Sequence, residues 1–264
     1  MTYENILYDV DGGIAKITMN KPDHLNPLGI DVVAELTAAF DAAEADAAVR
    51  AVILTGSGRG FSAGANLTAI DGEDIDLNDI DVAKSLDDSY NPMIRKMRRM
   101  QKPIVAAVNG VAVGAGLGLA LACDMVIAGR SALFSLIFTK IGLMPDAGGT
   151  FFVSRKIGIA RAMGMALTAE QISAEKAEAW GLIWQCVDDE DLMAEAETLA
   201  ASFANGPTRA YGMIKKSMYA GLANSLDEQL DLESTYQGWL GKTHDFKEGV
   251  TAFVEKRAAK FEGR

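Results

Sequence analysis

The pattern of apolar and polar residues alternates between short strands and amphipathic helices in the first part of the chain. Strands over residues 5–9 and 14–19 flank the turn Asp11-Gly12-Gly13 and predict a β-hairpin. Apolar residues then recur at helical spacing over residues 30–48. Continuous apolar runs predict buried strands over residues 51–54 and 104–108, and another strand is expected over residues 124–128. This order of strands and helices predicts an α/β fold.

The pattern changes after Gly158, where it becomes almost wholly helical. Ser173 is a typical N-cap for a helix over residues 174–180, which we expect to stop at Gly181. Amphipathic spacing predicts further helices over residues 191–205, 208–220 and 226–240. Because no flexible linker separates the two parts, we expect one continuous fold, with a core over residues 1–200 and a helical region over residues 201–264.

Two glycine-rich turns, over residues 61–66 and 109–116, each follow one of the predicted buried strands. A chain that turns from strand into helix leaves its first main-chain N–H groups unpaired at the positive end of the helix dipole. Two such groups aimed at one point would form an oxyanion hole, and small residues would let a ligand approach the main chain. The alternative is that the glycines only relieve close packing of helix on strand.

Composition narrows the class of protein. Hydrophobic residues make up 49% of the 264 residues, enough for a substantial core, and the net charge of −11 argues against a nucleic-acid or anionic-membrane partner. Cys123 and Cys186 fit no metal or redox spacing, and two histidines offer no ligand cluster, so we expect no metal. Without a visible targeting segment, the expected location is cytoplasmic. Residues 103–123 are uncharged, but we interpret them as strand, turn and buried helix rather than a membrane span.

The chain resembles the crotonase superfamily, which contains the enoyl-CoA hydratases and isomerases. The motifs that carry the resemblance lie at residues 19–22, 25–28, 61–65, 108–116, 145–150 and 246–257. The resemblance implies a spiral of ββα units with a helical C-terminal trimerisation region, and a homotrimer or dimer of trimers. It also implies an acyl-CoA thioester substrate, with coenzyme A as part of the substrate and no separate cofactor.

The resemblance assigns the oxyanion donors to the N–H groups of Ala63 and Ala115, which would stabilise a thioester enolate. Alanine at 115 would fit poorly if the turn required a positive φ there. The two glutamates of the family's hydratases correspond to Gly118 and Phe138. Neither residue can activate water, so ordinary hydration is disfavoured.

Asp146 is the candidate proton shuttle. It stands among apolar neighbours, whose burial would favour the protonated acid. From the residues alone, a cap for the helix that begins near Gly149 is the stronger interpretation. The family context reverses that order, because the segment resembles the isomerases of 2-(1,2-epoxy-1,2-dihydrophenyl)acetyl-CoA. The expected function is therefore an acyl-CoA isomerase; the alternatives are an atypical enoyl-CoA hydratase or a non-catalytic acyl-CoA-binding paralogue.

Further substrate contacts are expected around these groups: Gly64, Ala65, Asn66, Leu67, Gly114, Gly116, Phe138, Lys21, His24, Leu25, Arg59, Phe253 and Lys256. Lys256, with Arg257, could come from a neighbouring subunit. Residues 71–88 carry eight acidic side chains against one lysine. We interpret this segment as a mobile loop that covers the site, the alternative being a solvated surface loop or short helix.

Overall fold

The computed structural model describes residues 3–66 and 81–264. Its main sheet has six strands in the order β1-β2-β3-β5-β7-β10. β1 and β2 form the predicted antiparallel hairpin, and the other neighbours pair in parallel. The strands are β1 (Ile6–Asp11), β2 (Ile14–Met19), β3 (Ala51–Gly56), β5 (Ile104–Val108), β7 (Met125–Gly129) and β10 (Gln185–Val187).

A second sheet, which the hydrophobic pattern did not reveal, has four short strands in the order β4-β6-β8-β9. They are β4 (Gly60–Ser62), β6 (Val111–Val113), β8 (Leu133–Ser135) and β9 (Ile172–Ser173). β4 and β6 pair in parallel. Each follows a strand of the main sheet, and the segments 61–66 and 109–116 overlap these two neighbouring strands of the small sheet.

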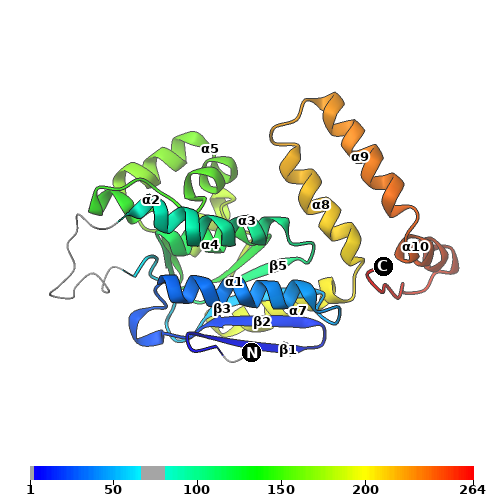
Figure 1. Ribbon diagram of the computed structural model, residues 1–264, viewed down its shortest axis with the longest axis horizontal. Coiled ribbons are helices and arrows are strands. Elements are labelled where there is room, and N and C mark those ends of the chain that lie inside the picture. The colour runs from blue at the N-terminus through cyan, green and yellow to red at the C-terminus, as the bar shows by residue number, and fades with distance from the viewer. Residues whose placement is uncertain (1–2, 67–80) are drawn as a thin grey trace.

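Helices cover both faces of the main sheet (Figure 1). Alternate side chains of β3 and β5 pack against α7 (Leu192–Ala204), through Ala196 and Ala200. The larger core lies on the other face, where α1 (Ile30–Ala45), α3 (Asn91–Arg99) and α4 (Ala115–Ala122) contribute buried residues. Because β3 is covered on both faces, all six of its residues are buried, which explains its continuous apolar run.

The remaining elements connect these layers. They are η1 (Pro22–His24), α2 (Val82–Ser85), the π-helical turn η4 (Leu86–Tyr90), η5 (Ile137–Ile141), α5 (Gly149–Thr168), α6 (Ala174–Trp180) and η6 (Asp189–Asp191). α6 has the predicted boundaries, with the Ser173 hydroxyl accepting from the Lys176 N–H and Gly181 in the left-handed region. α5 is interrupted at Gly158, whose φ of 76° is not helical.

The C-terminal helices α8 (Thr208–Ala220), α9 (Leu226–Leu240) and α10 (His244–Glu255) extend to one side of the core (Figure 1). α8 and α9 have the boundaries that their amphipathic spacing predicts. Arg50 ties the chain end to the core, donating from Nη1 to the Phe261 carbonyl oxygen at 2.8 Å. Buried Asp245 accepts from the N–H groups of Glu262 and Gly263, both at 2.8 Å. Within the described ranges, no helix has the length and apolar character needed to cross a bilayer.

Candidate active site

The two glycine-rich turns meet in space. Gly64, with φ of 86°, lies against the start of α4 so closely that a Cβ there would be 2.8 Å from the Val113 carbonyl oxygen and 3.3 Å from the Ala115 nitrogen. A side chain at position 64 would therefore fill the space beside the Ala115 N–H. Glycine is required here both for its conformation and for this close approach.

The second turn presents the first N–H groups of α4. The positive φ, 56°, falls on Gly114 rather than on Ala115, so alanine is accommodated without strain at position 115. Gly114 donates to the Ser135 carbonyl oxygen at 3.0 Å, and Leu117 donates back to the Gly114 carbonyl oxygen at 3.1 Å. The Ala115 N–H has no acceptor among the described residues, as expected at the first position of a helix.

Ala63 does not have the free N–H group that the sequence analysis assigned to it. Its N–H donates to the Leu25 carbonyl oxygen at 2.8 Å, so that group already has its acceptor. Ala65 is exposed, and its N–H has no acceptor in the described part of the chain. The geometry therefore moves the first candidate donor from Ala63 to Ala65, directly after the glycine that contacts Ala115.

Ser62 holds the first turn in place. Its hydroxyl is fully buried, donates to the Asn26 carbonyl oxygen at 2.8 Å and accepts from the Gly64 N–H at 3.2 Å. Gly116 packs directly on Ser62, since a Cβ at position 116 would be 2.9 Å from the Ser62 hydroxyl oxygen. Ser62 thus contacts both turns, and glycine at 116 makes that contact possible. A nucleophilic role is not needed to explain this serine.

Asn26 anchors the preceding loop to the same place. Its side chain donates to the Gly60 carbonyl oxygen at 2.7 Å and accepts from the Lys21 N–H at 2.8 Å. Leu25 and Asn26 both have positive φ, 58° and 52°, a conformation that costs energy for residues with a Cβ and is held here by these bonds.

The two positions that correspond to the hydratase glutamates both lie near the second turn. A Cβ at Gly118 would be 2.6 Å from the Ala147 carbonyl oxygen and 2.9 Å from the Ala147 Cβ. Gly118 therefore packs against the turn that carries Asp146, with no room for a side chain. The Phe138 ring is buried, and its edge lies 3.8 Å from where a Gly114 Cβ would be. Phe138 thus walls the site next to the second turn.

Asp146 lies in the turn between η5 and α5 and does not cap the helix. α5 has Gly148 as its N-cap, with no side-chain hydrogen bond. The Asp146 main-chain carbonyl accepts from the Gly149 N–H at 2.7 Å, whereas its side-chain Oδ1 is buried without a partner in the described structure. Burial raises the pKa of Asp146 from 3.8 to about 6. An unpaired carboxylate with a pKa near neutrality is typical of a group that transfers protons.

Tyr90 is a site neighbour that the sequence analysis missed. Its hydroxyl donates to the Leu28 carbonyl oxygen, and burial, with the nearby charge of Asp146, raises the pKa of Tyr90 to about 12. Tyr90 ends the π-helical turn η4, a distortion that is frequent at functional sites. A lone tyrosine in a polar stretch gave no signal that could have placed it here.

Several other predicted contacts gather next to Asn66. Lys21, His24 and Asn66 line one hollow of about 510 Å³. The Lys21 ammonium pairs with Asp31 at 3.0 Å. The Leu25 side chain instead packs towards Gly60, and Arg59 is exposed outside this hollow. Leu67 and most of the acidic segment 71–88 lie outside the described residues.

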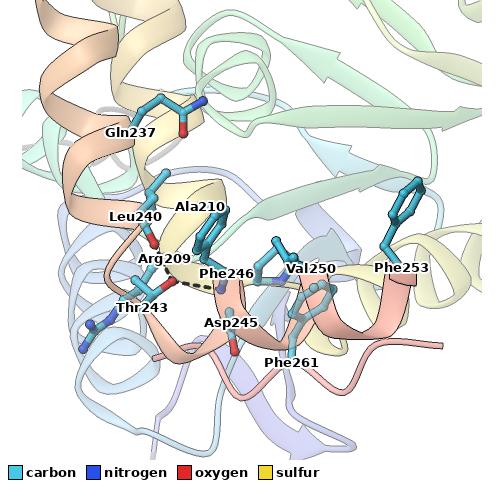
Figure 2. Close-up of a pocket in the computed structure, with 12 residues that line it drawn as sticks. Arg209, Ala210, Gln237, Leu240, Thr243, Asp245, Phe246, Val250, Phe253 and Phe261 are labelled. Atoms are coloured by element: carbon cyan, nitrogen blue, oxygen red, sulfur yellow. Dashed lines mark hydrogen bonds between the residues drawn. The ribbon is translucent and has the colours of Figure 1, made fainter. Parts of the chain in front are cut away.

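Phe253 and Lys256 are far from these turns within one chain. They lie on and after α10, at the opposite end of the molecule from α2 and α5 (Figure 1). Phe253 borders a separate apolar hollow of about 390 Å³ that Phe246, Val250 and Phe261 also line (Figure 2). A contribution of Lys256 to the site from a neighbouring subunit stays a prediction. In residues 3–66 and 81–264 no group of three or more His, Cys, Asp or Glu is placed to hold a metal ion.

The family model for enoyl-CoA hydratase/isomerase matches residues 9–264. The chain belongs to the enoyl-CoA hydratase/isomerase family. This confirms the resemblance to the crotonases. A probable enoyl-CoA hydratase of Rhodobacter capsulatus is 47% identical over 264 residues, covering 100% of both chains. The 1,2-epoxyphenylacetyl-CoA isomerase of Escherichia coli K12 is 44% identical over 263 residues, covering 99% of each chain.

Solved structures agree with the family and confirm the crotonase fold. The crystal structure of an enoyl-CoA hydratase from Bacillus anthracis superimposes with a TM-score of 0.92 at 31% identity, covering 99% of this chain and 100% of that one. An enoyl-CoA hydratase/isomerase structure from Mycobacterium abscessus gives a TM-score of 0.90 at 36% identity, covering 98% of this chain and 100% of the other.

Proposed function

We propose that this family member is an acyl-CoA isomerase in which Asp146 moves a proton while the N–H groups of Ala65 and Ala115 hold the thioester oxygen. The observation that carries the proposal is the Asp146 side chain, whose Oδ1 is buried and unpartnered, next to Ala147, which packs on Gly118 of α4. The 44% identity to a 1,2-epoxyphenylacetyl-CoA isomerase supports the same reaction class.

The reaction needs a base and then an acid. With a pKa of about 6, Asp146 is mainly ionised at pH 7 and can take a proton from the acyl chain. The negative charge that develops on the thioester oxygen faces the N–H groups of Ala65 and Ala115. Protonated Asp146 then returns the proton to another carbon, which moves a double bond or completes the rearrangement of a ring epoxide. No water has to enter the reaction.

The residues present argue against a hydratase. Hydration requires a group that activates water, and neither Gly118 nor Phe138 has a titratable side chain. Gly118 also has no space for one, since Ala147 occupies it. The intact turns and the unpaired Asp146 carboxylate likewise argue against a paralogue that only binds acyl-CoA.

The test is Asp146→Asn, assayed with a Δ3-enoyl-CoA, a Δ2-enoyl-CoA and the phenylacetyl-CoA epoxide. We expect isomerisation to fall by about 10²–10⁴, the usual contribution of general acid–base catalysis. Calorimetry should show that the variant still binds a CoA ester. Asp189→Asn is the control. Asp189, at the start of η6, accepts a hydrogen bond from the Ser131 N–H and has no role in the proposed reaction. Isomerisation at a near wild-type rate in Asp146→Asn, or rapid hydration by the wild type, would contradict the proposal.

A further inference from the structure

Lys102 and Lys215 are buried, and both are well bonded. Lys102 donates to three main-chain carbonyls at the end of α1, including the Glu44 oxygen at 3.0 Å. Lys215 pairs with Asp124 at 2.7 Å and donates to the Lys102 carbonyl at 3.0 Å. Lys156, on α5, is half-buried and has no hydrogen-bond or ion-pair partner among residues 3–66 and 81–264.

Lys156 lies in the wall of a hollow of about 240 Å³ between α5 and α8. The other walls are mostly apolar side chains: Phe151, Phe152, Met218, Tyr219 and Leu222. A space of this size and character fits a short acyl or aryl group. An amine without a partner therefore stands beside a cavity that would hold an apolar group next to it.

Burial and the nearby charges lower the pKa of Lys156. Arg98 on α3 stacks on the Tyr219 ring at 3.7 Å, and Arg155 on α5 stacks on the Phe151 ring at 3.7 Å. Asp124 is the acid on this side, and it already pairs with Arg98 at 3.1 Å and with Lys215. Burial, with the charge of Arg98, lowers the pKa of Lys156 against the smaller opposing effects of Asp124 and Cys123.

We propose that Lys156 is an acyl acceptor, modified by acyl thioesters whose acyl group enters the hollow between α5 and α8. The neutral Nζ attacks the thioester carbonyl carbon and forms the amide bond. The carbon–sulfur bond breaks, the thiolate leaves, and the proton lost from nitrogen ends on the thiol. The guanidinium group of Arg155, which also lines the hollow, favours an anionic donor such as a CoA ester, the substrate class of the proposed function.

The experiment incubates the folded protein with acetyl-CoA and with phenylacetyl-CoA and follows the acyl adduct on each lysine by peptide mass spectrometry from pH 6 to pH 9. We expect the initial rate at Lys156 to exceed the rate at the exposed Lys140 and Lys242 several-fold near pH 7.5. The rate at Lys156 should also level off at a lower pH. The readout is the adduct and not turnover, so it does not depend on whether the chain isomerises.

Met218→Glu supplies the missing partner, because exposed Met218 lines the same hollow. The new carboxylate should slow acylation of Lys156 several-fold and leave Lys140 unchanged, whereas the uncharged Met218→Gln should have little effect. Unfolding in urea should remove the advantage of Lys156. Acylation no faster than at Lys140, equal rates in the two Met218 variants, or an advantage that persists in urea would each overturn the proposal.

Discussion

Replacing Asp146 with asparagine should stabilise the protein at neutral pH. The wild-type carboxyl has a pKa of about 6 in the folded chain against 3.8 for the free group, so folding disfavours its ionised form. A difference of about two units corresponds to roughly 3 kcal/mol at ~1.4 kcal/mol per unit. Because the group is partly reached by solvent, we discount the cost of ionised Asp146 to about 1–2 kcal/mol. Asparagine keeps the shape and cannot ionise.

The pH dependence fixes the sign of the effect. A carboxyl whose pKa is raised by folding binds its proton more tightly in the native state, so its contribution to stability is full below about pH 4. It is lost as the pH rises through about 6. The free energy of unfolding of Asp146→Asn should therefore match the wild type near pH 4 and exceed it by about 1–2 kcal/mol at pH 7.5.

Urea unfolding at a fixed protein concentration from pH 4 to pH 8 measures this difference. Asp189→Asn is a control of opposite sign, because the Ser131 N–H lowers the pKa of Asp189. That variant should lose stability at pH 7.5, with the loss shrinking as the pH falls through the acid range. If Asp146→Asn is less stable than the wild type at pH 7.5, or its advantage does not change with pH, then Asp146 is not a buried, unpaired carboxyl.

Two further substitutions test the scaffold of the site. Ser62→Ala leaves the Asn26 carbonyl and the Gly64 N–H without their partner. We therefore expect a loss of about 1–3 kcal/mol in the free energy of unfolding and a fall in kcat. The control is Ser57→Ala, which removes a buried hydroxyl without a partner and should change neither quantity much. Gly118→Ala places a methyl group against Ala147 and should cost about 1–3 kcal/mol, whereas Gly164→Ala, in open space on α5, should stabilise by about 0.5–1 kcal/mol in the same denaturant assay.

Much of the fold could be predicted because buried strands and amphipathic helices have distinct periods. β5, α6, α8 and α9 have the boundaries that their patterns predict. The short strands of the second sheet have two or three residues each, too few to show a period. These strands were therefore hidden, and β4 and β6 overlap the segments predicted as glycine-rich turns.

The candidate site shows where residue patterns stop being informative. The glycine spacing predicts that two turns present main-chain N–H groups to one point, but which N–H is free depends on hydrogen bonds across the fold. Ala63 and Ala65 are the same residue type two positions apart, and only the Leu25 carbonyl, which Ala63 contacts at 2.8 Å, distinguishes them. Asp146 shows the opposite case. Its turn sequence favoured a helix cap, and the structure uses Gly148 there, leaving the carboxyl free.

Gly118 shows why hydration could not be introduced into this site simply by adding a carboxylate. A glutamate at 118 would have to displace Ala147, whose φ of 47° already makes its turn conformation costly. Any such displacement moves the neighbouring Asp146 as well. The missing side chain at Gly118 and the carboxyl at Asp146 are therefore two parts of one packing arrangement. A chain with glycine at 118 can bring the 145–148 turn against α4, and that packing of Ala147 on Gly118 sets where the neighbouring Asp146 carboxyl lies.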